Sequence, residues 1–116
     1  MKEIFTIVGI LDKILSAIRE WKSTSPEEER KKLCERVRNY HRRLKEACEK
    51  DSKVYRLASD IEKDHLFCIA VGYDYYGKIL TYLRNLDKLT SRQKEFKKQM
   101  CRDLLSGFES IWKELL

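Results

Sequence analysis

The 116-residue sequence has little proline and glycine, with one and four residues respectively. Chains rich in strands and turns need more of both, so this composition favours an all-α protein. The sequence also lacks an apolar run of the ~18 residues that a membrane-spanning helix requires. The apolar segment 4–11 is followed by charged residues without a small-residue cleavage site, which argues against a secretory signal. We therefore expect a cytoplasmic protein that does not engage a membrane.

The four cysteines form no CxxC motif and no close pair along the sequence. In the absence of a secretory signal, this arrangement is typical of reduced thiols. Cys34, His41 and Cys48 are spaced seven residues apart. On a helix this spacing separates neighbours by more than ~10 Å, too far to share one metal ion. Glu62 and His65 have the E-x-x-H spacing of di-iron proteins, but the second copy that such a centre needs is missing. We expect no metal and no cofactor, and a buried, hydrogen-bonded His65.

Apolar residues recur at helical spacing in four segments, which predicts an up-and-down four-helix bundle in a single domain, residues 1–116. The expected helices cover residues 2–22, 26–50, about 52–87 and about 91–115. Ser25, Pro26 and Glu28 have the pattern of a capping box at the start of the second helix. The third helix is either continuous or kinked or broken near Gly72–Gly77.

Residues 66–71 are apolar on every side of the third predicted helix. Four helices of one chain cannot cover a helix all round, so this segment indicates self-association. Tyrosines follow from residue 73 onward, and their amphipathic rings are typical of subunit interfaces. We expect a homodimer or a higher homo-oligomer. The predicted interface residues are Leu66, Phe67, Ile69, Tyr73 and Tyr76.

The net charge of +6 is carried by residues 30–50, which contain nine basic and three acidic residues. On a helical wheel the basic side chains form two rows beside an acidic midline. Each row extends roughly 20 Å, long enough to follow several backbone phosphates. The first row holds Lys32, Arg36, Arg43 and Lys50, and the second holds Lys31, Arg38, Arg42 and Lys45.

This charge distribution favours binding over catalysis. We expect a small non-catalytic binding or adaptor module whose basic helix meets an acidic partner, with nucleic acid or a nucleoprotein complex ahead of an acidic protein surface. The predicted nucleic-acid-binding residues are Lys31, Lys32, Arg36, Arg38, Arg42, Arg43 and Lys45. Two alternatives are a solvated helix face stabilised by pairs such as Arg42 with Glu46, and a protein-binding inhibitor or structural subunit.

The segment Arg36-Val37-Arg38-Asn39-Tyr40-His41 resembles the R-x4-H signature of the HEPN ribonuclease superfamily. Members of that superfamily are small helical bundles that commonly dimerise. Their Arg and His side chains, drawn from two chains, form a metal-independent RNA-cleaving site. The resemblance implies an alternative function in which Arg36 would steady the scissile phosphate and His41 would move the proton. On one helix these two side chains point ~140° apart, with His41 toward the core.

Overall fold

A computed structural model describes residues 7–116, which contain six α-helices and one short 3-10 helix, with no strand in that range. The predicted all-helical class is therefore confirmed. The helices are α1 (Ile7–Thr24), α2 (Glu27–Lys50), α3 (Tyr55–Glu62), α4 (His65–Val71), α5 (Tyr73–Lys88) and α6 (Lys94–Leu115), with η1 (Ser91–Gln93) directly before α6. The part of the first predicted helix that contains Ile4 and Phe5 lies outside the described residues. No helix within residues 7–116 is long and apolar enough to cross a membrane.

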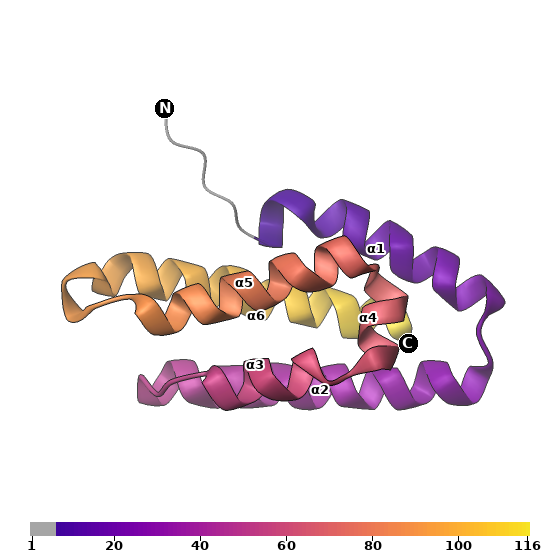
Figure 1. Ribbon diagram of the computed structural model, residues 1–116, viewed down its shortest axis with the longest axis horizontal. Helices are drawn as coiled ribbons and strands as arrows, with labels where there is room; N and C mark the ends of the chain where they lie inside the picture. The colour runs from indigo at the N-terminus through magenta and orange to yellow at the C-terminus, as the bar shows by residue number, and fades with distance from the viewer. Residues whose placement is uncertain (1–6) are drawn as a thin grey trace.

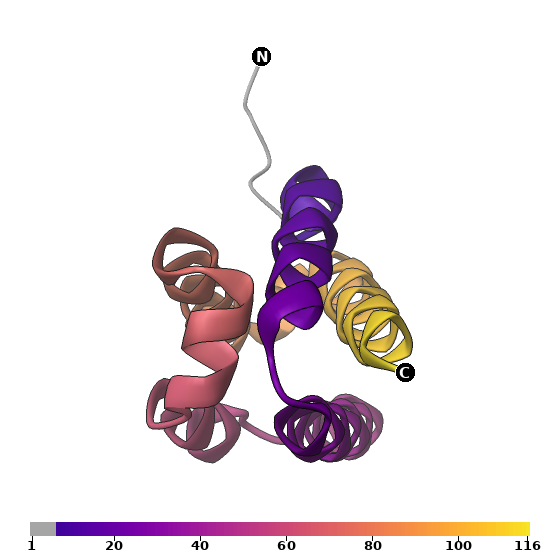
Figure 2. The ribbon, with the colours of Figure 1, turned by 90° about the vertical axis from the view of Figure 1, so that its right-hand side faces the viewer.

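Helix α6 packs along both α1 and α2 and so joins the two ends of the chain. The long helices follow the longest axis of the molecule, while α4 crosses one end of it between α3 and α5 (Figure 1, Figure 2). The apolar faces meet in one core cluster that includes Ile14, Leu44, Ile79 and Phe108. Burial of these faces is the main source of stability for helices of such lengths.

The third predicted helix is divided into α3, α4 and α5, so six helices replace the four expected. One break falls at Gly72, as the sequence allowed, where the backbone φ of +93° lies in the region that favours glycine. Gly77 instead lies inside α5. The break before α4, at Asp64, was not predicted from the sequence. There the carboxylate of Asp64 accepts a hydrogen bond from the N–H of Phe67 at 3.1 Å and caps the new helix.

The crosswise position of α4 accounts for much of the apolar character of residues 66–71, although Ile69 remains exposed. This helix packs against α1 and α5, and Phe67, Ala70 and Val71 are buried there. The ring of Phe67 stacks on that of Phe108, with the centroids 6.5 Å apart. Phe67 has no exposed surface and belongs to the core of its own chain, which corrects its predicted place in a subunit interface.

The second helix begins one residue later than predicted and without a capping box. Helix α2 begins at Glu27, Pro26 is its N-cap, and the hydroxyl of Ser25 finds no hydrogen-bond partner within the described residues. Three glutamates in the first turn still favour a helix start there, because they face the positive end of the helix dipole. A capping box occurs instead before α6, formed by Thr90 and Gln93.

Candidate nucleic-acid interface

The first basic row of α2 faces α3 and α4. The Nη1 atom of Arg36 lies 2.8 Å from Oδ1 of Asp64, and Nη1 of Arg43 lies 2.8 Å from Oδ2 of Asp60. Asp60 belongs to α3, and Asp64 caps α4. These two arginines therefore join α2 to its neighbours, so an external anion would have to compete with carboxylates of the same chain.

Asp64 is the only charged residue that is buried within residues 7–116. Its carboxylate accepts hydrogen bonds from the hydroxyl of Tyr40 at 2.5 Å, from Arg36 and from the backbone of Phe67. Burial and the hydrogen bond to Asp64 together raise the pKa of Tyr40. A buried carboxylate with three donors is a satisfied structural group. Sequence reasoning missed it because the apolar period continues through Asp64 without a visible interruption.

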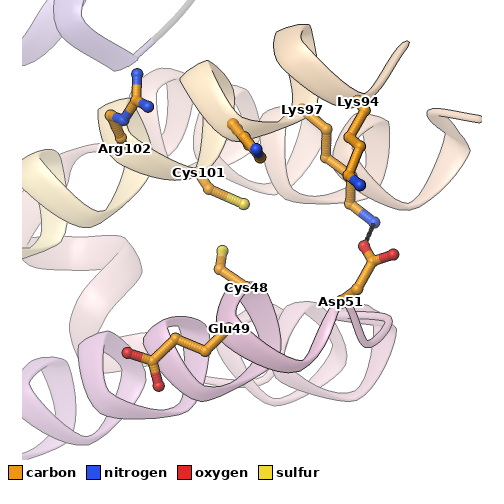
Figure 3. A pocket seen from close by; sticks show the side chains of 8 residues that line it. Cys48, Glu49, Asp51, Lys94, Lys97, Cys101 and Arg102 are labelled. Carbon is orange, nitrogen blue, oxygen red and sulfur yellow. Dashed lines mark hydrogen bonds and ion pairs between the residues drawn. The ribbon is translucent and has the colours of Figure 1, made fainter. Parts of the chain in front are cut away.

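The second basic row of α2 lies exposed beside α6. Three interactions between the helices show that they are antiparallel neighbours. The guanidinium carbon of Arg38 lies 5.0 Å from the centroid of the Trp112 ring. Further along, the sulfur atoms of Cys48 and Cys101 point toward one another (Figure 3), and Nζ of Lys97 lies 2.7 Å from Oδ1 of Asp51. Residue numbers on α2 thus rise as those on α6 fall.

Helix α6 brings three exposed basic residues to the same junction, and the sequence did not single them out. We call the combined set the seam surface. Its members are Arg38, Arg42 and Lys45 of α2 with Lys94, Lys98 and Arg102 of α6, all exposed. Acidic side chains also lie at this junction. Glu46 pairs with Arg42 at 3.4 Å and Glu95 with Lys98 at 3.7 Å, while Glu109 is close enough to act on His41 and Lys45, and Glu49 lies beside the α6 residues. The seam surface is therefore predominantly but not uniformly basic.

Two hollows of about 400 Å³ each lie along the junction of α2 and α6. The first is lined by Arg38, Asn39, His41, Arg42 and Trp112. A guanidinium that lies over an indole ring is held in place while its N–H groups remain able to donate. The second is lined by Cys48, Glu49, Asp51, Lys94, Lys97, Lys98, Cys101 and Arg102 (Figure 3).

The structure does not bring Arg36 and His41 together within one chain. Arg36 pairs with Asp64 on the side of α3 and α4, whereas His41 faces α6 near Glu109. Burial lowers the pKa of His41. The other histidine, His65, is exposed, which corrects the expectation that it is buried. Within residues 7–116, no three His, Cys, Asp or Glu side chains gather in a way that could hold a metal ion.

The predicted interface residues fall into three groups. Phe67 is in the core, as described above. Leu66 and Tyr76 are half-buried, and the hydroxyl of Tyr76 donates to the backbone carbonyl of Glu62. Ile69 and Tyr73 are 66% and 79% exposed, so they are the apolar surface that remains for a second chain at this corner.

Comparison with protein-family models, with curated proteins and with solved structures finds no match for this chain.

Proposed function

We propose that this protein is a non-catalytic cytoplasmic binding module whose seam surface binds the phosphate backbone of a nucleic acid, free or within a nucleoprotein complex. The observation that carries the proposal is the meeting of exposed basic residues from two helices at one junction. Three of them come from α2 and three from α6. A basic surface built from two elements can follow a polyanion better than one helix face alone.

The antiparallel register orders these charges along a line. Because Cys48 faces Cys101, Arg102 follows Lys45 in the direction of α2, and Lys98 and Lys94 come after it. At ~1.5 Å per residue, the distance from Arg38 to Lys94 along the helix axis is roughly 25 Å. A single strand of nucleic acid places several phosphates within such a length. The seam surface therefore suits a run of phosphates and not one isolated anion.

The seam surface replaces the residue set expected from α2 alone. Arg36 and Arg43 drop out because they pair with Asp64 and Asp60 of the neighbouring elements at 2.8 Å. Arg42 and Lys98 also have acidic partners, Glu46 and Glu95, but these longer pairs join neighbours on one exposed helix face. Lys32 lies on the same row as these two, away from α6. Lys31 continues the α6-facing row toward the start of α2, where it pairs with Glu27 at 3.5 Å. At one end of the seam the guanidinium of Arg38 lies over the Trp112 ring, and such a planar group can itself stack on the bases of a single strand.

Fluorescence anisotropy with labelled single-stranded RNA and DNA would test the proposal. We expect binding that weakens steeply with salt and depends little on sequence, because phosphate contacts release counterions. The variant Lys45→Ala/Arg102→Ala removes one charge from each helix. It should lower the slope of log K against log salt by about 0.7 to 0.9 for each lost phosphate contact.

The chain offers a matched control for this variant. Lys32→Ala/Lys50→Ala removes the same charge from the other row of α2, and none of the four side chains forms an ion pair with another residue in the range 7–116. The control should retain the salt slope of the native chain. Equal losses in the two variants would show that net charge alone attracts the nucleic acid and would contradict a site at the seam.

Two further outcomes separate the competing functions. Absence of RNA and DNA binding at ~50 mM salt would overturn the nucleic-acid proposal and favour an acidic protein partner. Cleavage of labelled RNA in the presence of EDTA, lost in His41→Ala, would establish the HEPN-like ribonuclease instead. We expect the RNA to stay intact, because Arg36 and His41 face different neighbours.

A further inference from the structure

Two cysteines that are far apart in the sequence meet at the end of the α2–α6 junction. Cys48 lies in the last turn of α2, and Cys101 lies in the third turn of α6. Their sulfur atoms point toward one another across the hollow that opens between the helices (Figure 3). Both thiols line this hollow, so a small molecule that enters it meets the two sulfurs together.

The two thiols are not equivalent. The interaction between the two thiols lowers the pKa of Cys101 and raises that of Cys48. The ammonium group of Lys97 also favours the thiolate of Cys101. Cys101 therefore loses its proton first, and the thiolate is the nucleophilic form of cysteine.

The wall of the hollow selects for negative charge. Four basic residues line it, Lys94, Lys97, Lys98 and Arg102, against two acidic ones, Glu49 and Asp51. Asp51 is paired with Lys97, and Lys98 is paired with Glu95, which leaves Lys94 and Arg102 against Glu49. An anionic molecule is thus attracted to the sulfurs, whereas a cationic one is repelled.

We propose that Cys48 and Cys101 form a thiol–disulfide exchange site for a small anionic disulfide of the glutathione disulfide type. The site does not depend on nucleic-acid binding. The remaining cysteines lack these features. Cys34 and Cys68 do not line the hollow, Cys34 donates its S–H to the carbonyl of Trp112 at 3.4 Å, and burial raises the pKa of both.

The reaction proceeds in two exchanges. The thiolate of Cys101 attacks one sulfur of the small disulfide, its S–S bond breaks, and one small thiolate leaves. Cys48 then loses its proton and attacks the sulfur of Cys101, which forms the Cys48–Cys101 disulfide and releases the second small thiolate. The two protein thiols are oxidised, the small disulfide is reduced to two thiols, and the two protons lost by the cysteines pass through solvent to the products.

The test is to expose the reduced full chain at low salt to glutathione disulfide, which is anionic, or to cystamine, which is cationic. Alkylation of the remaining thiols and peptide mass mapping then locate the oxidised cysteines. We expect a Cys48–Cys101 disulfide, formed about tenfold faster or more by glutathione disulfide than by cystamine. The ratio of the two rates is divided by the same ratio measured for the urea-unfolded chain, which corrects for the intrinsic reactivity of the two disulfides. Added salt should lower the rate ratio of the folded chain to that of the unfolded chain, because salt screens the charges of the hollow.

Variants assign the roles of the two cysteines. Cys48→Ser should stop at a mixed disulfide on Cys101, and Cys101→Ser should react slowly. Lys94→Gln/Lys98→Gln/Arg102→Gln should lose the preference for the anionic disulfide. Oxidation of Cys34 or Cys68 ahead of this pair in the folded native chain would overturn the proposal, as would a glutathione disulfide to cystamine ratio equal to that of the unfolded chain.

Discussion

Asp64 links α2 to the start of α4 through a single carboxylate. Arg36 and Tyr40 reach it from α2, and the N–H of Phe67 reaches it from the first turn of α4. The side chains of Tyr40 and Asp64 are both buried, so water cannot replace the hydrogen bond between them. The position and direction of α4 depend on this contact.

We predict that Asp64→Ala lowers the free energy of unfolding by about 2 to 4 kcal/mol, because α4 loses its N-cap and the Tyr40 hydroxyl is left buried without a partner. Urea unfolding followed by circular dichroism measures the change. Asp60→Ala is the control, since it breaks the exposed pair with Arg43 and should cost less than about 1 kcal/mol. Similar losses in both variants would contradict a structural role specific to Asp64.

His41 should make stability depend on pH between about 5 and 7. Burial lowers its pKa in the folded protein below 6.5; Lys45 also lowers it, and Glu109 acts in the opposite direction. The unfolded chain therefore binds the proton first as the pH falls, so stability decreases as the solution becomes more acidic. The contribution is complete above the unfolded pKa of about 6.5 and is lost as the pH falls through the folded pKa.

The urea midpoint measured at pH 7 and pH 5 tests this prediction. His41→Gln should make the two midpoints more alike, because the replaced side chain does not titrate. His65→Gln is the matched control, since His65 is exposed, and it should retain the pH dependence of the native chain. A pH dependence that survives His41→Gln would assign it to another group.

At the scale of elements, the junction of α4 and α5 depends on one glycine. Gly72 has a φ of +93° and ends α4 where α5 begins. We predict that Gly72→Ala lowers the free energy of unfolding by about 1 to 2 kcal/mol, because an L side chain is strained in this conformation. Thermal or urea unfolding would measure the loss.

Gly77 provides the control for Gly72. It lies inside α5, and a Cβ added there meets no atom within 4 Å. Gly77→Ala should therefore stabilise the protein by about 0.5 to 1 kcal/mol, because alanine favours the helix. Opposite signs for the two substitutions are expected. Stabilisation by both would mean that the break between α4 and α5 does not need a positive φ.

Helix α2 has different neighbours on its two basic rows. The row with Arg36 and Arg43 holds α3 and α4 in place, while the row with Arg38 and Lys45 lies exposed at the junction with α6. A sum of charge over the helix cannot separate these roles, because the acidic partners of the first row come from later in the chain.

At the scale of the whole molecule, Ile69 and Tyr73 form the apolar surface that is left after α4 is packed. We expect a homodimer that uses this corner, and light scattering after size exclusion would measure its mass. Ile69→Ser/Tyr73→Ser should shift the protein to the monomer, because the variant removes most of the exposed apolar area there. Tyr55→Ser changes another exposed tyrosine and should leave the mass unchanged. A monomeric native chain would make the sequence-based prediction of self-association wrong.

Much of the helical structure was predictable because it depends on local spacing. Leu33, Val37, Tyr40 and Leu44 recur at helical intervals, and all are buried. The break at Gly72 was also visible, since glycine marks such positions. The break at Asp64 was not, because the capping carboxylate is held by Arg36 and Tyr40, which lie 28 and 24 residues earlier and do not enter a local sequence pattern.

The candidate sites also depend partly on local sequence pattern and partly on tertiary contacts. The sequence by itself determined the helical class, the inward faces of the helices and the concentration of charge between residues 30 and 50. Only the tertiary structure decided which arginines are neutralised, that Lys98 and Arg102 join the exposed row of α2, and that Cys48 faces Cys101. The physical reason is that periodicity fixes where a side chain points on its own helix, whereas its partner is fixed by the packing and direction of the neighbouring helix.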